Sequence, residues 1–374
     1  MTRAVSALHP PPGRHPYYIV APPYTRFSAG ARVLHLLCHA LNSVGQTAFL
    51  VDKDGCPPGT PFVHPDLLTP RLSAEVVDYH FAAGLTPVTV YPEVVEGNPF
   101  SAPLVVRYVL NFPGLLGGDS IYPPSELCYG YSRSLAESAG APDNILFIPA
   151  SDTAVFHPPQ QPVRRQGSCF YAVKYRSQNV GPLLPRTAGA VEITRDMSQQ
   201  DMAALFQRSE WLFCYENTAA ALEATLCGCP AVFLPNAHLT ERIGDDVVGW
   251  DGYAWGDGPD ELERAARTVG AAWDNYLKSI EGFWSQLDLF IARTQARAVA
   301  TPYGAVMRVP LPRPGRWRQE GVLWWNAIRY VLRREGVRGL ACRVSRRLWS
   351  GKRSKESVVG GKAWRSSAEG KRCD

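Results

Sequence analysis

The sequence predicts an α/β protein made of two halves, each with its own parallel sheet. In the first half, a β-rich run at residues 17–21 is followed by a helical pattern at 28–41 and a second strand at 47–51. This strand–helix–strand order is typical of neighbouring parallel strands. A similar alternation begins at residues 169–173, after a proline-rich stretch at 158–162. The repeat of one pattern on both sides of that stretch predicts two domains of similar strand–helix character.

Further elements follow from local pattern and capping chemistry. The remaining predicted strands cover residues 88–91, 104–110, 145–149, 191–193, 211–214 and 231–234. A helix is predicted over 198–209 with Ser198 as its cap, and residues 259–290 are predicted to be mostly helical. The predicted domains are residues 1–158, residues 159–300 and a C-terminal tail at 301–374.

Composition bounds the class of protein. A chain of 374 residues with 45% hydrophobic and 20% charged residues fits a soluble globular protein. It has no apolar run long enough for a membrane span and no signal-peptide pattern at its start. Its nine cysteines lack metal-site spacing. We therefore expect reduced, mostly buried thiols, no metal site and a cytoplasmic location.

The charge is unevenly distributed. Residues 301–374 carry 18 Lys and Arg against 5 Asp and Glu, whereas the rest of the chain carries 21 against 29. Within the tail, residues 317–349 mix tryptophans and aliphatic residues with arginines. This mixture favours a helix that lies on an anionic membrane surface, with nucleic-acid binding and packing on the protein as alternatives. The last residues, 351–374, are polar and predicted to be disordered.

The most informative stretch is residues 215–230, in which Glu216 and Glu223 lie seven positions apart. It follows an apolar strand and predicts a turn, a short helix and a further strand. A helix N-terminus offers backbone amides to an anion, and carboxylates can accept hydrogen bonds from sugar hydroxyls. This favours a nucleotide-sugar over a metal or a hydride cofactor. The alternative is a capping acid followed by a solvated helical glutamate.

Two smaller features support an anion site. Lys174 and Arg176 end a strand-like run, where cations suit a pyrophosphate, although they also fit an ordinary surface loop. Ser28 and Gly30 start the first helix, where Gly30 would let a ligand approach the backbone, although an ordinary helix start explains them equally well. The sequence has neither a G-x-G-x-x-G fingerprint nor a P-loop.

Three segments, within a span of about residues 17–300, resemble the group-1 glycosyltransferases of the GT-B fold. Residues 216–230 resemble that family's two-glutamate motif, which ends in Glu-Ala-x-x-x-Gly-x-Pro. Residues 27–30 with 41–45 are similar to its opening loop and first helix, and residues 148–156 to its interdomain segment. The resemblance implies two Rossmann-like domains whose parallel sheets face each other across a cleft.

The resemblance also implies roles for individual residues. Glu223 would accept hydrogen bonds from the donor ribose, and Glu216 would face the transferred sugar. Backbone amides of Asn217 and Thr218 would bind the diphosphate, Lys174 and Arg176 would neutralise it, and Gly30 would let the first domain close. One departure concerns Glu216, because the family places its glutamates eight positions apart and Tyr215 stands where the first would fall.

The implied activity is hexosyl transfer from a nucleotide-sugar to a polysaccharide or lipid-linked glycan at the inner membrane face. No metal or cofactor is expected, and the two-glutamate motif implies retention of anomeric configuration. An inverting enzyme would need a base, for which His64, His80 and Glu93 are candidates. Possible acceptor contacts are Glu93, Asn98, Arg107 and Asn111, or these residues only structure their loops. The alternatives are a non-catalytic sugar- or nucleotide-binding protein of the same fold and a nucleic-acid-binding protein that uses the tail.

Overall fold

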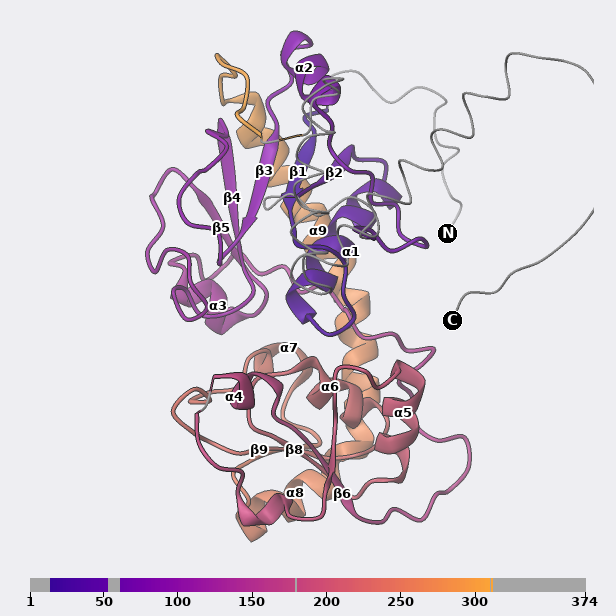
Figure 1. Cartoon of the computed structure of the whole chain (residues 1–374). Helices are drawn as coiled ribbons and strands as arrows, with labels where there is room; N and C mark the ends of the chain where they lie inside the picture. Colours follow the sequence, from indigo (N-terminus) through magenta and orange to yellow (C-terminus); the bar gives the residue numbers. More distant parts are fainter. Residues whose placement is uncertain (1–13, 53–60, 179, 310, 312–374) are drawn as a thin grey trace, which may run out of the picture. The chain divides into compact units, whose positions relative to one another are not determined.

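The computed structural model describes residues 14–52, 61–178, 180–309 and 311, and it contains two five-stranded sheets (Figure 1). All strand pairs within both sheets are parallel. The prediction of an α/β protein with two Rossmann-like halves is therefore confirmed. The basic tail from residue 312 onward, including the predicted membrane segment 317–349, lies outside the described residues.

The first sheet has the strand order β2-β1-β3-β4-β5. Its strands are β1 (Tyr17–Val20), β2 (Ala48–Val51), β3 (Val88–Pro92), β4 (Leu104–Val109) and β5 (Leu127–Gly130). The helices of this half are α1 (Ala29–Ser43), α2 (Ala74–Ala82) and α3 (Arg133–Ser138). Nearly every strand residue is buried, which explains why these strands are continuous apolar runs rather than alternating ones.

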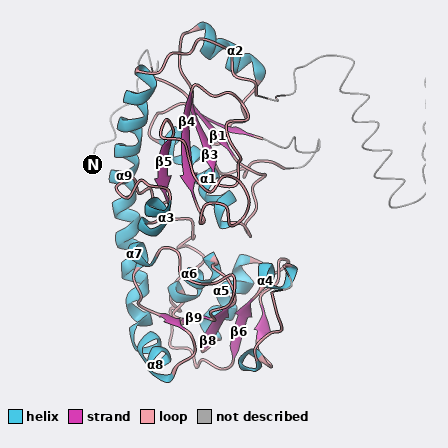
Figure 2. Ribbon diagram, turned by 90° about the vertical axis from the view of Figure 1, so that its left-hand side faces the viewer, coloured by secondary structure: helices cyan, strands magenta, loops and turns pink. Residues whose placement is uncertain are grey.

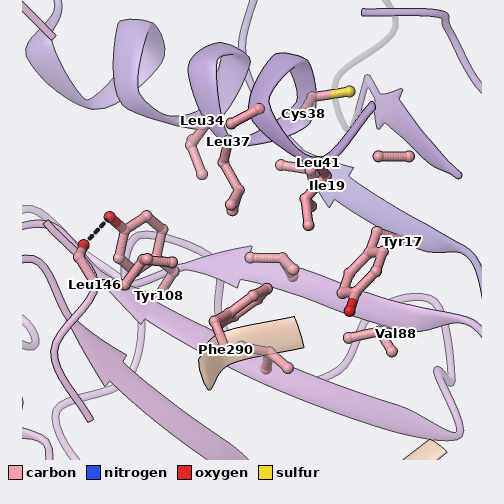
Figure 3. Close-up of a cluster of buried hydrophobic side chains, with 14 of the residues drawn as sticks. Tyr17, Ile19, Leu34, Leu37, Cys38, Leu41, Val88, Tyr108, Leu146 and Phe290 are labelled. Carbon is pink, nitrogen blue, oxygen red and sulfur yellow. Dashed lines mark hydrogen bonds between the residues drawn. The ribbon is translucent and has the colours of Figure 1, made fainter. Parts of the chain in front are cut away.

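Helix α1 is fixed by its cap and its apolar face. The Ser28 side chain accepts a hydrogen bond from the backbone N–H of Ala31 at 3.2 Å. Leu34, Leu37 and Leu41 recur at helical spacing and pack on the strands of the first sheet (Figure 3). In the same core, the Tyr108 hydroxyl donates to the carbonyl of Leu146.

The second sheet has the strand order β10-β9-β8-β6-β7. Its strands are β6 (Ser168–Tyr171), β7 (Val191–Glu192), β8 (Trp211–Cys214), β9 (Ala231–Phe233) and β10 (Tyr253–Trp255). Its helices are α4 (Val173–Ser177), α5 (Gln199–Arg208), α6 (Ala219–Leu226), α7 (Asp245–Val248) and α8 (Pro259–Thr268), with 3₁₀ turns at Pro185–Thr187 and Val269–Ala271. Ser198 caps α5 as predicted.

The helix α9 (Ala272–Val299) packs against both halves, as Figure 2 shows. Tyr276, near its start, belongs to the core of the second half, whereas Phe283, Leu287 and Phe290 belong to the core of the first. The Tyr276 hydroxyl also bonds to both backbone groups of Ser151, in the segment that joins the halves. The described residues form one compact unit, so α9 ties the two sheets together.

One predicted strand differs from the structure. Residues 145–149 do not form a strand, and only Ile145 makes an isolated bridge, to Gly130. The backbone N–H of Phe147 donates to the side chain of Gln286 in α9 instead of to a neighbouring strand. The prediction that residues 259–290 are mostly helical is confirmed, with a 3₁₀ turn that contains Gly270 between α8 and α9. Within the described ranges, no helix is long and apolar enough to cross a membrane.

The described cysteines agree with the prediction of reduced, mostly buried thiols. Six of the nine lie in the described ranges, and all six are buried free thiols. Burial raises the pKa of the Cys38 thiol to about 12. A thiol of this kind packs as a small hydrophobic side chain and stays protonated.

Candidate functional site

A cleft of about 540 Å³ is lined by both halves of the described chain. Its walls are formed where strands end and helices begin, which is where open α/β sheets bind ligands. The first half contributes residues from the start of α1 and from the ends of β3 and β4. The second half contributes residues at the starts of α4 and α6 and from the loop before α7.

The N-terminus of α6 opens on this cleft. Thr218 caps the helix, accepting from the backbone N–H of Ala220 at 3.2 Å, and both Thr218 and Ala219 line the cleft. Asn217 anchors the turn, since its amide donates to the carbonyl of Glu241 and accepts from the N–H of Ile243. The helix dipole and the backbone amides at this end are the features that favour an anion at a helix N-terminus.

Glu216 lies in the cleft wall and is partly engaged by the protein. Its Oε2 accepts from the backbone N–H of Lys174 at 2.6 Å and of Tyr175 at 2.8 Å, at the start of α4. Its Oε1 is buried and has no hydrogen-bond partner. Burial raises the pKa of Glu216, and the Tyr175 amide and the Lys174 charge oppose that rise. One oxygen therefore fixes the start of α4, whereas the other keeps an unused capacity to accept a hydrogen bond.

Glu223 lies in α6 and forms an ion pair with Arg32 of α1, with Nη1 and Oε1 2.8 Å apart. The two side chains are 4% and 5% exposed, so the pair is buried. It lines a narrow recess together with Tyr171, Arg195 and Thr218. The sequence offered one signal for this pair, an arginine within the buried face of an apolar helix, and our sequence reasoning missed it.

The two predicted cations separate in the structure. Lys174 lines the cleft, but Arg176 does not, and its guanidinium pairs with Glu192 at 2.7 Å. The prediction placed both at a strand end, whereas they lie in the helix α4. Residues two apart on a helix do not face the same way, which explains the separation.

A third cation, Arg242, takes a place in the cleft wall that the sequence did not reveal. It is 6% exposed, and its guanidinium stacks on the Tyr253 ring at 3.6 Å from the ring centre. Its Nη1 donates to the carbonyl of Gly249, and no described carboxylate lies within ion-pair distance of it. Burial lowers the pKa of Arg242, and Tyr253 and the nearby acids Asp245 and Asp246 oppose that shift. A buried cation of this kind favours an anionic ligand.

On the opposite wall, Glu93 follows directly on the end of β3 and is 4% exposed. Its Oε2 accepts from the backbone N–H of Leu110 at 3.1 Å. Burial raises the pKa of Glu93 to about 7, although the Leu110 amide and the cations Lys174 and Arg107 act against it. Asn111 also lines the cleft, and its side-chain oxygen accepts from the backbone of Phe112.

Two predicted acceptor contacts do not line the cleft. Arg107 is completely buried and forms two bonds to Glu126, at 3.0 and 3.1 Å. It also donates to the carbonyls of Val95 and Gly97. Asn98 uses its side chain to close its own loop onto Ala102. These two residues therefore structure the loop after β3, because their polar groups are already satisfied within the protein.

The remaining predicted residues have simpler placements. Ser28 and Gly30 line the cleft at the start of α1. A Cβ on Gly30 would meet Leu110 at 3.6 Å, an ordinary contact, so packing does not require glycine there. His80 bonds to the Tyr18 hydroxyl at 2.8 Å and His64 packs on Tyr24, and neither lines the cleft. No described group of three or more His, Cys, Asp or Glu residues is arranged to hold a metal ion.

No protein-family model and no curated protein matches the chain. Solved structures similar to it include AviGT4, a glycosyltransferase involved in avilamycin A biosynthesis (16% identity, 78% of this chain and 99% of that chain, TM-score 0.42). SnogD, a glycosyltransferase from Streptomyces nogalater, is also similar, with 13% identity over 77% of this chain and 99% of that chain and a TM-score of 0.38. A mutant O-GlcNAc transferase from Thermobaculum terrenum is similar with 13% identity over 77% of this chain and 69% of that chain and a TM-score of 0.40.

The loop beside Glu93 provides a matched pair of glycines. Gly117 and Gly118 both have positive φ, but a Cβ on Gly118 would lie 2.0 Å from the carbonyl oxygen of Glu93, whereas one on Gly117 meets nothing within 4 Å. Both alanine substitutions carry the backbone cost of about 1–2 kcal/mol. We expect Gly118→Ala to cost about 1–3 kcal/mol more, because the loop must move off Glu93. Urea unfolding measures the difference, and equal losses would contradict the close packing.

Proposed function

We propose that the chain is a glycosyltransferase that binds a nucleotide-sugar in this cleft and transfers its sugar to a hydroxyl group. One observation carries the proposal: the N-terminus of α6 opens on the cleft that Glu216, Lys174 and Arg242 also line, and Glu223 lines the narrow recess that shares Thr218 with this cleft. This arrangement supports a diphosphate at the helix N-terminus, with one carboxylate toward the sugar and the other toward the ribose.

The donor would fit these groups as follows. The diphosphate would bind backbone amides at the N-terminus of α6, which Thr218 caps. Lys174 and Arg242 would neutralise its charge. Glu223 would accept hydrogen bonds from the ribose, in competition with Arg32. The unpartnered Oε1 of Glu216 would accept one from a hydroxyl of the transferred sugar.

The chemical step would break the bond between the sugar C1 and the phosphate oxygen, through an oxocarbenium-like state. Negative charge then grows on the departing nucleoside diphosphate. The dipole of α6 and the two cations would stabilise this charge in a partly closed cleft, where such interactions are strong. The proposal includes no metal ion or other cofactor. The family resemblance implies retention of anomeric configuration, and NMR of the product tests it.

The acceptor and the location extend the proposal. We propose a polysaccharide or lipid-linked glycan as acceptor, with residues 317–349 binding the cytoplasmic membrane surface. Support comes from the basic and aromatic composition of that segment. A chain shortened by residues 317–374 should lose binding to vesicles that contain anionic lipid. Unchanged vesicle binding would contradict the role of the tail, and loss of RNA or DNA binding instead would favour the nucleic-acid alternative.

Lys174 and Arg176 provide the test of the donor site. Calorimetry with UDP, dTDP, GDP and ADP should show binding of at least one of them. Lys174→Ala should weaken that binding at least tenfold, because one charge-assisted contact contributes about 1.5–3 kcal/mol. Arg176→Ala is the control, since Arg176 lies in the same short helix but pairs with Glu192 outside the cleft.

Equal effects of the two substitutions, or no binding of any nucleoside diphosphate, would contradict the proposed donor site. Tight binding without release of nucleoside diphosphate from any nucleotide-sugar in a broad panel would instead support the non-catalytic alternative. The two outcomes differ because binding and turnover are measured separately.

A further inference from the structure

We infer that Glu93 is the general base of the transfer and removes the proton of the acceptor hydroxyl as its oxygen attacks C1 of the donor sugar. The inference rests on the proposed function. It adds a catalytic residue in the first half, and it predicts a single displacement with inversion at C1. This outcome departs from the retention that the family resemblance implies.

The first argument is position. Among the described residues that line the cleft, the acids are Glu93 and Glu216. Glu216 belongs to the second half and binds the start of α4. Glu93 belongs to the opposite wall, yet Lys174 is close enough to it to affect its charge. Glu93 is therefore the carboxylate that an acceptor would meet on the side facing the bound donor.

The second argument is restraint. The N–H of Leu110 holds Oε2 of Glu93, and Gly118 packs against the carbonyl of the same residue. The alternative bases suggested by the sequence, His64 and His80, do not line the cleft. A base must be held within hydrogen-bond reach of the proton that it removes, and a fixed backbone and one fixed oxygen provide that restraint.

The third argument is the electrostatic setting. The charged groups that face Glu93 are Lys174 from α4 and Arg107 from β4, with the phenol of Tyr122 nearby. Arg107 is already paired with Glu126, so it offsets the burial of Glu93 only in part. Burial dominates and raises the pKa of Glu93 to about 7. A base with a pKa near the working pH is deprotonated and still takes up a proton readily.

The step balances without a further reactant. The acceptor O–H bond breaks and its proton moves to the Glu93 carboxylate, while the oxygen lone pair forms a bond to C1. The C1–phosphate bond breaks, and its electron pair stays on the nucleoside diphosphate. Glu93 then returns its proton to water. Because the oxygen enters opposite to the leaving group, the configuration at C1 inverts.

Azide provides a test that needs no knowledge of the natural acceptor, because azide attacks C1 without losing a proton. UDP-glucose, UDP-N-acetylglucosamine, dTDP-glucose and GDP-mannose are the donors, and the one that the unmodified chain hydrolyses is used. Glu93→Ala and Glu93→Gln should lower the release of nucleoside diphosphate at least 100-fold. Both should bind the nucleoside diphosphate within about twofold of the unmodified chain, which also reports folding.

Azide should restore turnover in Glu93→Ala and give a glycosyl azide whose anomeric configuration is opposite to that of the donor, as seen by proton NMR. The same substitution at Glu96, which is exposed and three residues away, should change nothing. Undiminished hydrolysis, failure of azide rescue in a variant that still binds nucleotide, or a product of retained configuration would overturn the inference. If the unmodified chain binds no nucleoside diphosphate, the proposed function falls as well.

Discussion

Replacing Glu223 with Gln should lower the free energy of unfolding by about 3 kcal/mol and weaken nucleoside diphosphate binding at least tenfold. The stability loss arises because Arg32 would keep its charge in a buried position without its partner. Removing one member of a buried ion pair typically costs about 3–5 kcal/mol. The binding loss arises because a neutral amide replaces a carboxylate that would accept from the ribose hydroxyls, a contact of about 1.5–3 kcal/mol.

Two further variants separate stability from binding. Arg32→Met also leaves a buried charge unpaired, so it should be less stable, but the freed Glu223 carboxylate should bind the nucleotide at least as tightly. Arg32→Met combined with Glu223→Leu replaces the pair by apolar side chains, which is often neutral or stabilising. That double variant should recover the stability but not the affinity. Urea unfolding and calorimetry provide the two measurements, and recovery of affinity in the double variant would exclude Glu223 as a nucleotide contact.

The fold was largely predictable because its determinants are local. The strands β1 and β2 and the helix α1 follow from apolar periodicity and from the Ser28 cap, which needs only the neighbouring turn. Parallel pairing follows from the order of the elements. The strand expected at residues 145–149 failed for a non-local reason, because the distant Gln286 takes up the N–H of Phe147. The sequence around residues 145–149 gives no information about a side chain that lies about 140 positions away.

Only the part of the site that is formed by consecutive residues was predictable from the sequence. Residues 216–223 form one motif, and their place at a helix start can be derived from the sequence. The pair between Arg32 and Glu223 joins residues 191 positions apart, and Arg242 lies in a loop without periodicity. Only the folded chain reveals these neighbours. Lys174 and Arg176 were both expected in the cleft because a five-residue helix was interpreted as the end of a strand. In the helix their side chains point in different directions.

Glu93→Gln should make the protein more stable at pH 8 by about 3 kcal/mol, although it should also slow the transfer at least 100-fold. Burial raises the pKa of Glu93 from its ordinary value of 4.5 to about 7, a difference equivalent to about 3 kcal/mol. The folded state therefore binds the Glu93 proton more tightly than the unfolded chain does. This contribution to stability is complete below pH 4.5 and is lost as the pH rises to about 7.

A glutamine keeps the shape of the side chain, accepts from the N–H of Leu110 and has no charge to bury. The variant and the unmodified chain should therefore be about equally stable at pH 4.5 and diverge as the pH rises. Comparing the two chains cancels the titration of other groups, including Glu216, whose pKa burial also raises. Glu96→Gln, at an exposed position three residues away, is the control for removing a carboxylate outside the cleft. A gain in stability that accompanies a loss of turnover is expected of a carboxylate kept in a buried cleft for its chemistry, and a stability loss at pH 8 would place Glu93 among the structural groups instead.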